Sequence, residues 1–326
     1  MSERVSIIIP VFNQKKDYLV RCFESAIGQD YEDIEIIIVD DDSTDDTLEF
    51  CRKLCEGHER CKVLHQEHKR QGGARNTGVA AATGQYIFFL DSDDWVEKNT
   101  ISRLHALIKE YHAQIAVCGC FKQNEKGEVF REAREEEIVV LDRFHALESY
   151  VFDTAYCNHS PCDKLYDIKL FAGEQFVENS YYEDLGSVYK FVRHADTVVY
   201  TNEQLYCYFD NLSSTMHKPF SEHEFDKIKW YHAISEYFFE TDRRLYRSFI
   251  REMDRQTVYC AIGFVYKARQ VPATEKLAEK IKDTRAICKK IKSRIGFRLN
   301  LLRKLIVFSP ALFCKVWKVY QKRQER

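Results

Sequence analysis

Apolar and polar residues alternate in blocks over the first 112 residues of the chain. Short apolar runs rich in β-branched residues occupy residues 5–9, 34–39, 62–65 and 86–90. The apolar spacing of amphipathic helices occurs between these runs, at residues 17–28, 45–55 and 73–82. Because strands that alternate with helices form βαβ units, the pattern predicts an α/β fold with a mostly parallel, doubly wound sheet.

The rest of the chain has a different pattern. Residues 122–180 are irregular, and the acidic patch 132–137 within them is expected on a solvated surface. The other predicted elements are a helix over 96–111, a strand over 114–121, a helix over 183–194, a strand over 197–208, and helices from 219 onward with breaks near 270–272 and 309–310. We therefore expect a helical C-terminal extension after the α/β domain.

The charges are distributed unevenly along the chain, although its net charge is only −2. Residues 276–326 contain 16 Lys or Arg and three acids, a net charge of +13, which leaves −15 for the first 275 residues. An acidic body with a basic tail favours an anionic surface as the partner of the tail. We expect no nucleic-acid partner.

Residues 295–317 of this tail mix apolar and basic side chains. A helix that spans a bilayer needs about 20 consecutive, mainly apolar residues. The run is interrupted by Arg298, Arg303, Lys304, Pro310 and Lys315. A helix that lies on a membrane surface needs one apolar face and one Lys/Arg-rich face, which this pattern supplies. A basic helix packed on the protein body fits the same pattern, so both interpretations stay open.

The N-terminal residues and the cysteines indicate the cellular compartment of the protein. Residues 5–10 already have a strand pattern, so we expect no signal peptide. The twelve cysteines include no CxxC pair, which favours reduced core thiols over a zinc site. The expectation is a cytoplasmic protein, and peripheral contact with the cytoplasmic face of the membrane is one of the two interpretations of its tail.

The acidic sequence Asp91-Ser92-Asp93-Asp94 directly follows the apolar run 86–90. A run this apolar is typical of a strand buried on both faces, and ligands bind at the carboxyl ends of strands in open α/β sheets. Carboxylates so close together repel each other unless a cation joins them. A divalent metal ion that carries a phosphorylated ligand is the simplest interpretation.

Two further segments occupy comparable positions. Asp40 and Asp41 follow the second predicted strand, where a carboxylate can accept a hydrogen bond from a ribose hydroxyl or a base N–H. Helix capping alone explains residues 43–46. Gly73 and Arg75 lie where a loop enters a predicted helix. Glycine permits close backbone approach there, the helix N-terminus favours phosphate, and arginine can bind phosphate with two parallel hydrogen bonds.

Two common nucleotide-binding signatures are missing from the sequence. The first predicted strand is not followed by GxGxxG, and GxxxxGKS/T occurs nowhere in the chain. A dinucleotide-dependent dehydrogenase and a P-loop kinase are therefore disfavoured. An acid-rich site that holds a diphosphate through a metal ion remains favoured.

Four segments match one known family in order and in spacing. They are Ser6-Ile7-Ile8-Ile9-Pro10-Val11-Phe12-Asn13, Ile37-Ile38-Val39-Asp40-Asp41-Asp42-Ser43-Thr44-Asp45, Gly73-Ala74-Arg75-Asn76-Thr77-Gly78 and Phe88-Phe89-Leu90-Asp91-Ser92-Asp93-Asp94. Over residues 4–112 the chain thus resembles the family 2 glycosyltransferases of the GT-A fold. A thinner resemblance continues through Asp163-Lys164-Leu165-Tyr166, Tyr182-Glu183-Asp184 and Gln204-Leu205-Tyr206-Cys207-Tyr208. The chain departs from the family pattern at Asp42, where the family often has Gly.

The resemblance implies roles for the matching acids. Asp91-Ser92-Asp93 is similar to the family's DxD motif, in which Asp93 would bind Mg²⁺ or Mn²⁺ and Asp91 would contact the ribose or the metal shell. Asp184 would be the general base, and His217 would complete the metal site in the way some members do. Without the resemblance, an acid at the start of the predicted helix 183–194 would serve only to stabilise the helix dipole.

The resemblance also implies a nucleotide pocket. Asp41 would recognise the base. The other residues implied near the nucleotide and its diphosphate are Pro10, Val11, Asn13, Gly73 and Arg75. Residues 1–215 would form the catalytic domain, with a nucleotide-sugar half at 1–112 and an acceptor half at 113–215, and residues 216–326 would form the helical region with the basic amphipathic tail.

The implied activity is inverting, metal-dependent glycosyl transfer. A sugar of the hexosyl or N-acetylhexosaminyl class would move from a nucleoside diphosphate, with UDP favoured, to a hydroxyl of a glycan or a lipid-linked acceptor in surface polysaccharide synthesis. Two alternatives stay open at this point. One is a nucleotidyltransferase that acts on a sugar phosphate, and the other is a non-catalytic glycan-binding or scaffold protein.

Overall fold

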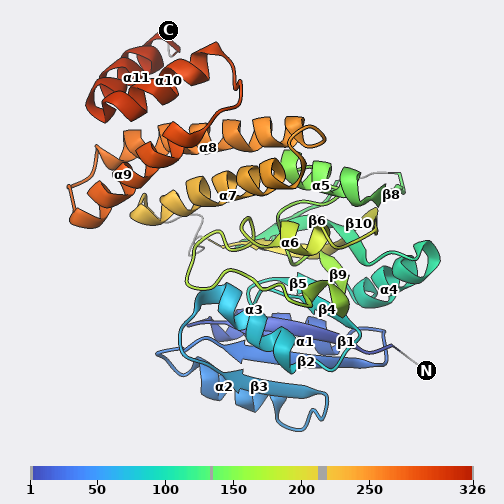
Figure 1. The fold of residues 1–326 in the computed structure, drawn as a ribbon. Helices are drawn as coiled ribbons and strands as arrows, with labels where there is room; N and C mark the ends of the chain where they lie inside the picture. The colour runs from blue at the N-terminus through green and yellow to red at the C-terminus, as the bar shows by residue number, and fades with distance from the viewer. Residues whose placement is uncertain (1–2, 133–134, 212–218, 325–326) are drawn as a thin grey trace. The chain divides into compact units, whose positions relative to one another are not determined.

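The computed structural model describes residues 3–132, 135–211 and 219–324 (Figure 1). The chain divides into two compact units. The sheet unit comprises Met1–Asn179 and Ser187–His217, and the helical unit comprises Ser180–Gly186 and Lys218–Arg326. The short segment Ser180–Gly186 thus belongs with helices that follow it much later in the sequence.

One sheet of ten strands forms the centre of the sheet unit, in the order β3-β2-β1-β4-β9-β6-β10-β5, with β7 on β6 and β8 on β10. The strands are β1 (Val5–Val11), β2 (Ile34–Asp40), β3 (Cys61–His65), β4 (Tyr86–Phe89), β5 (Trp95–Val96), β6 (Ile115–Asn124), β7 (Val129–Phe130), β8 (Ile138–Asp142), β9 (Lys164–Asp167) and β10 (Thr197–Asp210). The α/β fold class expected from the alternating pattern is confirmed.

The strand directions place the loops that carry the expected site residues at one edge of this sheet. β1 is parallel to β2 and β4, and β2 is parallel to β3. β9 is antiparallel to both β4 and β6, so β4 and β6 run in the same direction, and β10 is parallel to β6. The carboxyl ends of β1, β2, β4, β6 and β10 therefore lie at a single edge.

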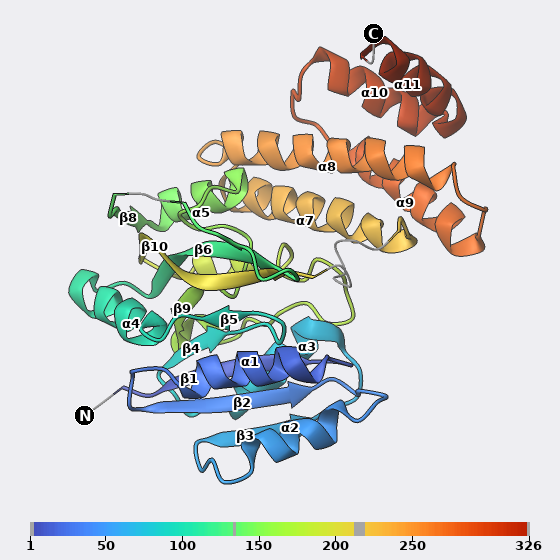
Figure 2. The same cartoon turned by 180° about the vertical axis from the view of Figure 1, so that it is seen from behind.

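Helices cover both faces of the parallel part of the sheet (Figures 1 and 2). The helices of the sheet unit are α1 (Lys16–Ile27), α2 (Thr47–Cys55), α3 (Arg70–Ala81), α4 (Thr100–Tyr111), α5 (Arg143–Phe152), the 3-10 helix η1 (Ile168–Phe171) and α6 (Val188–Val192). Every residue of β1, β2 and β4 is buried. This double burial explains why these strands are continuous apolar runs.

Two predicted helices differ from the structure. The helix expected over 96–111 begins at Thr100, because Trp95–Val96 pairs with β10 as the antiparallel strand β5. The helix expected over 183–194 is wrong for its first turn, since α6 begins only at Val188. Residues 183–187 form turns, and Tyr182 before them has a left-handed φ of 56°, which a right-handed helix does not accommodate.

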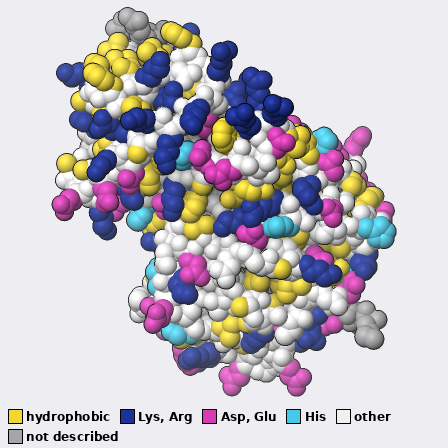
Figure 3. All heavy atoms as spheres, in the orientation of Figure 1, with side chains coloured by type: hydrophobic (Ala, Val, Ile, Leu, Met, Phe, Trp, Pro, Cys, Tyr) yellow, Lys and Arg dark blue, Asp and Glu magenta, His cyan; other side chains and the backbone are white. Residues whose placement is uncertain are grey.

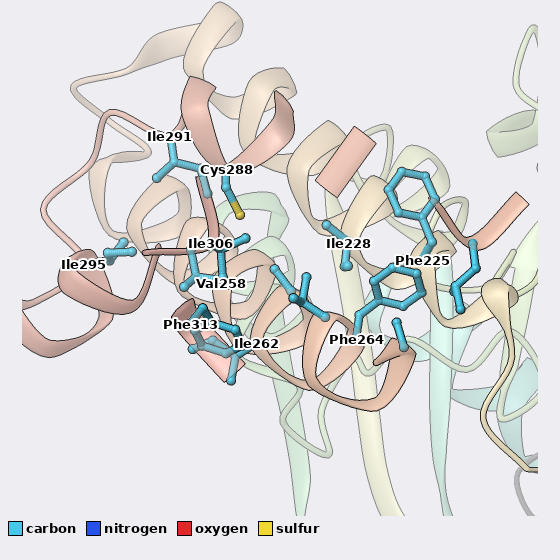
Figure 4. Packing of buried hydrophobic residues seen from close by; sticks show 14 residues of the cluster. Phe225, Ile228, Val258, Ile262, Phe264, Cys288, Ile291, Ile295, Ile306 and Phe313 are labelled. Carbon is cyan, nitrogen blue, oxygen red and sulfur yellow. The ribbon is translucent and has the colours of Figure 1, made fainter. Parts of the chain in front are cut away.

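The helical unit is built from the 3-10 helix η3 (Glu222–Glu224), α7 (Phe225–Asp242), α8 (Arg247–Ala268), α9 (Glu275–Lys290), α10 (Phe297–Phe308) and α11 (Pro310–Gln324). The breaks predicted near 270–272 and 309–310 are confirmed. Figure 4 shows the apolar cluster that joins these helices, from Phe225 on α7 to Phe313 on α11. Ile306 and Phe313 are fully buried in it, so α10 and α11 each pack one face against the other helices of this unit.

The cysteines depart in one place from the expectation of reduced thiols. Cys55 at the end of α2 and Cys61 at the start of β3 form a disulfide, with their Cα atoms 5.4 Å apart. The turn between the two elements brings these cysteines within bonding distance, and the other ten cysteines are free. Across the part of the chain that the structure describes, no helix has both the length and the apolar character to cross a bilayer.

Candidate active site

The loops after β1, β2 and β4 are hydrogen-bonded to one another at the carboxyl edge of the sheet. Asp41 N donates to Val11 O at 2.9 Å, and Asn13 Nδ2 donates to Thr44 Oγ1 at 3.1 Å. Gln14 Nε2 donates to Ser92 Oγ at 2.9 Å, which links the first loop to the third. Pro10 lies inside the buried strand β1, next to Val11.

Asp42 in the second of these loops has a φ of 65°. This left-handed conformation carries no steric cost for glycine and is tolerated by aspartate better than by most residues. The position where the resemblance leads us to expect Gly is therefore one where the backbone requires a left-handed residue. Asp42 preserves the turn.

Arg75 and Asp91 form a largely buried ion pair. Arg75 Nη2 lies 2.8 Å from Asp91 Oδ1, and the Arg75 side chain is only 2% exposed. The guanidinium also lies 5.5 Å from the ring centroid of Phe176. The structure thus places Arg75 as the partner that holds Asp91 in position.

Glycines let helix α3 approach its neighbours closely enough to place Arg75. A Cβ on Gly78 would lie 2.3 Å from Ile8 Cγ2 of β1, and one on Gly73 would lie 2.3 Å from Lys69 Cβ. Such distances are far below van der Waals contact. Gly73 therefore serves the packing of the first turn of α3, so the segment that the sequence predicts as a loop entering the helix is already helical.

Asp93 has a different environment from Asp91. Burial, followed by the negative charge of Asp91, raises the pKa of Asp93 to about 6. Asn211 Nδ2 donates to Asp93 Oδ2 at 2.6 Å. Arg21 Nη2 donates to the Asp93 carbonyl at 2.8 Å, so side chains distant in the sequence fix both ends of this residue.

Asp94 anchors the same loop to β10. It is 3% exposed and accepts hydrogen bonds from Tyr206 Oη at 2.5 Å and from Phe209 N at 2.8 Å. Burial and the nearby charges of Asp93 and Asp91 raise the pKa of Asp94 well above its usual range. Asp94 therefore supports the loop from inside the protein.

Sequence reasoning missed Arg21, which lies in the middle of α1. Its guanidinium carbon is 4.0 Å from the ring centroid of Trp95 and 4.1 Å from that of Phe209. Contact of one guanidinium with two aromatic rings is a favourable cation–π arrangement when the charge is partly desolvated. No motif in the sequence marks Arg21, because its partners come from β5, β10 and the Asp93 loop.

Asp41 is buried among protein donors at the end of β2. It is 2% exposed, and its Oδ1 accepts from Gln66 Nε2 at 2.7 Å and from Lys69 N at 2.8 Å. His68 Nδ1 lies 2.9 Å from Asp41 Oδ2, and the His68 ring lies 4.8 Å from the half-exposed ring of Phe12. Residues 66–69, which follow β3, thus surround Asp41. Because β3 is parallel to β2, the segment after β3 is expected at the same edge of the sheet as Asp41.

The general base expected from the resemblance lies in the other unit. Asp184 is half-buried in the turn Ser180–Gly186 of the helical unit, and Leu185 N donates to Asp184 Oδ1 at 2.7 Å. His217 lies outside the described residues. The structure brings together the other expected residues within the sheet unit: Pro10, Val11, Asn13, Asp41, Gly73, Arg75, Asp91, Ser92 and Asp93.

The donor chemistry at Asp91 and Asp93 fits a divalent cation that prefers oxygen ligands. The repulsion that helps to raise the pKa of Asp93 is what a bound cation would relieve. Magnesium-type ions use one or two carboxylates and take further ligands from phosphates and water. Within residues 3–132, 135–211 and 219–324, no cluster of three or more His, Cys, Asp or Glu side chains forms a complete metal cage.

Comparisons with known proteins agree with this architecture. The family model "Glycosyl transferase family 2" matches residues 6–171. Glycosyltransferase GlyG of Streptococcus pneumoniae serotype 4 is 32% identical over 247 residues, which cover 73% of this chain and 79% of GlyG. Glycosyltransferase GlyA of the same organism is 30% identical over 243 residues, which cover 72% of this chain, and the chain spans only 33% of GlyA.

A solved structure shows the same fold. The structure of S. aureus TarS 1–349 in complex with UDP-GlcNAc aligns with a TM-score of 0.74 over 98% of this chain and 92% of that chain, at 19% sequence identity. At this identity the likeness speaks for the fold alone. Together with the family model and GlyG, it shows that the chain belongs to glycosyl transferase family 2 and is a glycosyltransferase with the GT-A fold.

Proposed function

We propose that this protein is an inverting, metal-dependent glycosyltransferase that moves a hexosyl or N-acetylhexosaminyl group from a UDP-sugar to a hydroxyl of a glycan or lipid-linked acceptor. The observation that carries the proposal is the pair Asp91 and Asp93 after the carboxyl end of β4, at the same edge of the sheet as the buried acid Asp41 after β2. The UDP-GlcNAc in the TarS structure supports a UDP-linked donor. Surface polysaccharide synthesis is the role that such a transfer would serve.

The donor end of the site would bind and orient the nucleotide. Asp41 and His68 supply polar groups for the base, and Phe12 offers a half-exposed ring beside them. Asp91 would accept from the ribose or bind in the metal shell, with Arg75 holding its carboxylate in one orientation. This division leaves Asp93 as the acid available to a cation.

Asp93 would hold Mg²⁺ or Mn²⁺, with Asp91 in support and His217 as a proposed third ligand. A bound cation of this kind stabilises the charge that develops on the leaving diphosphate. Burial of Asp93 strengthens its attraction for a cation, because the surrounding protein screens charge less than water does. Arg21 and Asn211 keep the loop in place from two sides.

Asp184 would act as the general base in the transfer. The acceptor hydroxyl oxygen forms a bond to the anomeric carbon while the bond from that carbon to the diphosphate oxygen breaks, and the hydroxyl proton passes to the Asp184 carboxylate. Attack from the side opposite the diphosphate inverts the anomeric centre. The products are the glycosylated acceptor and UDP.

The test is a UDP-release screen over UDP-sugars with Mn²⁺, read with and without glycan or lipid-linked acceptors. Transfer predicts free UDP that requires the metal. Pyrophosphate formed from a nucleoside triphosphate and a sugar phosphate would instead support a nucleotidyltransferase. Glycan binding with neither product would support a binding or scaffold protein, and either result would overturn the proposal.

We place this reaction at the cytoplasmic face of a membrane, with α10 and α11 as the contact. Exposed apolar side chains recur at helical spacing on both helices: Phe297, Leu301 and Phe308 on α10, and Leu312, Val316, Val319 and Tyr320 on α11. Figure 3 shows hydrophobic side chains interspersed with Lys and Arg over these helices. Apolar anchors flanked by basic residues suit an anionic lipid surface.

A further inference from the structure

The turn that carries Asp184 is attached to the first part of α7. Asp226 Oδ2 accepts hydrogen bonds from Ser180 Oγ at 3.1 Å and from Tyr181 N at 3.0 Å. Trp230 Nε1 lies 3.1 Å from Ser180 Oγ and 3.3 Å from Tyr181 O, as a donor to both. Asp226 and Trp230 are four residues apart, which places them on the same face of the helix.

The other end of the turn contacts the same tryptophan. A Cβ on Gly186 would lie 2.7 Å from Trp230 Cδ2, so only glycine allows the chain to pass the indole ring this closely. Trp230 therefore touches the segment at both of its ends, at Ser180 and at Gly186. Asp184 lies between these two contacts.

Tyr182 adds a third attachment and a strained backbone. Its φ of 56° is unusual for a bulky residue, and such conformations persist only when the surroundings hold them. Tyr182 Oη donates to Glu224 Oε1 at 3.3 Å, and Lys227 Nζ lies 4.3 Å from the tyrosine ring centroid. Burial, together with the charge of Glu224, raises the pKa of Tyr182.

We infer that Asp226 and Trp230 are positioning residues for the reaction, because they fix the backbone from which Asp184 projects. The inference rests on the proposed function, which gives Asp184 its role as general base. It makes the helical unit part of the catalytic machinery, beyond any role of α10 and α11 at a membrane. A displacement of about 1 Å at a reacting group can cost on the order of 100-fold in rate.

The test compares variants in the full-length protein. Asp226→Ala removes the acceptor for Ser180 and Tyr181, Asp226→Asn keeps an acceptor oxygen, and Trp230→Phe removes the indole N–H together with the five-membered ring. The control is Asp254→Ala, since Asp254 is a buried acid of the helical unit that, like Asp226, accepts a hydrogen bond from a serine, here from Ser235 Oγ at 2.7 Å. The readouts are kcat and KM for Mn²⁺-dependent UDP release from the UDP-sugars of the screen, the affinity for UDP, and the melting temperature.

We expect Asp226→Ala and Trp230→Phe to lower kcat on the order of 10- to 100-fold while UDP affinity and the KM for the UDP-sugar stay unchanged. Asp226→Asn should restore most of kcat. Asp254→Ala should lower the melting temperature at least as much, because Asp254 is the more buried acid, and leave kcat intact. Unchanged kcat in Asp226→Ala and Trp230→Phe, or an equal loss of kcat in Asp254→Ala, overturns the inference.

Asp184→Asn, measured together with these variants, distinguishes a failure of the proposed role of Asp184 from a failure of the proposed role of α7. If Asp184→Asn turns over at the normal rate, the proposed role of Asp184 is wrong and the inference fails with it. If Asp184→Asn is inactive while Asp226→Ala and Trp230→Phe are normal, the proposed function stands and only the role of α7 is wrong.

Discussion

Arg75 Nη2 donates to Asp91 Oδ1 at 2.8 Å from a position that is 2% exposed. The two acids of the Asp91-Ser92-Asp93 sequence therefore differ in what surrounds them. Asp91 has a fixed cationic partner, whereas burial and the charge of Asp91 raise the pKa of Asp93 to about 6. In this loop Asp91 is ion-paired with Arg75, whereas the ionised form of Asp93 is electrostatically unfavourable. A cation would therefore be bound most favourably at Asp93.

Replacing Arg75 should destabilise the protein. Arg75→Ala leaves the Asp91 carboxylate without its buried partner, and breaking such a pair costs roughly 3 kcal/mol. Unfolding by urea measures this loss. Arg4→Ala is the control, because Arg4 pairs with Asp33 at the surface and its loss should destabilise the protein much less. Equal losses in the two variants would contradict the assignment of Arg75.

Asp93→Asn should stabilise the metal-free protein and abolish its response to metal. Because the pKa of Asp93 in the folded protein is about 6 against an ordinary 3.8, the folded state loses stability as pH rises from about 4 to about 6. The variant should gain roughly 1–2 kcal/mol at pH 8 after allowance for partial exposure, and nothing below about pH 4.

Thermal shifts with Mn²⁺ and UDP complete the test of Asp93. The melting temperature of the unmodified protein should rise when Mn²⁺ and UDP are added together, and that of Asp93→Asn should not. Asp30→Asn, at an exposed acid, should behave like the unmodified protein. Full Mn²⁺-dependent stabilisation by UDP in Asp93→Asn would rule out Asp93 as the metal ligand.

Glu35 should give a second, purely structural pH dependence. Burial raises the pKa of Glu35, but hydrogen bonds from Ser6 and Thr83 and the Lys62 ammonium outweigh burial and lower the pKa from 4.5 to about 2. Glu35 therefore stabilises the fold above about pH 4.5, by roughly 1–2 kcal/mol at neutral pH after allowance for solvent screening, and this contribution disappears as pH falls toward about 2. Glu35→Gln should lose most of it.

Urea unfolding of Glu35→Gln at pH 7 and at pH 3 checks the sign of this effect. The difference from the unmodified protein should be largest at pH 7 and should narrow at pH 3. Glu32→Gln, at an exposed position, serves as the control. If the difference in unfolding free energy between Glu35→Gln and the unmodified protein grew as pH falls, the lowered pKa of Glu35 would be contradicted.

Asp184→Asn should separate binding from turnover. The amide keeps the size of the side chain but cannot take the acceptor proton, so transfer should fall at least about 100-fold. UDP affinity, measured by calorimetry with Mn²⁺, should stay unchanged, because the proposed nucleotide contacts lie in the sheet unit. Normal transfer by Asp184→Asn would exclude it as the base.

The membrane proposal predicts lipid binding that depends on both exposed phenylalanines of α10. Phe297 is 84% exposed and Phe308 is 80% exposed. The protein should float with vesicles that contain phosphatidylglycerol and not with phosphatidylcholine alone, and high salt should weaken the binding. Phe297→Ser combined with Phe308→Ser should abolish flotation, while Leu245→Ser, also exposed, should not. Self-association without any flotation would favour a second copy of the chain as the partner.

Local sequence was enough to predict the centre of the fold. β1, β2 and β4 are continuous apolar runs because both of their faces are buried, and their site residues follow each run directly. The loops of parallel strands meet at one edge, so the acids Asp41, Asp91 and Asp93 could be grouped without coordinates.

The missed features depend on contacts between distant segments. Arg21 is placed by Trp95 and Phe209, and neither aromatic residue is near it in the sequence. The residue types of the turn before α6 predict a helix, yet Tyr182 is held in a left-handed conformation within a segment attached to α7. Tertiary contacts override local propensity at such positions.

The division of the chain into units also bears on how such a protein can change during evolution. The chain passes from one unit to the other three times, after residues 179, 186 and 217. A recombination event that exchanged only residues from 218 onward would bring in a foreign α7 and leave the native turn 180–186 without its own Asp226 and Trp230. We therefore expect substitutions in α7 to be accompanied by substitutions in a seven-residue segment that lies more than thirty positions upstream.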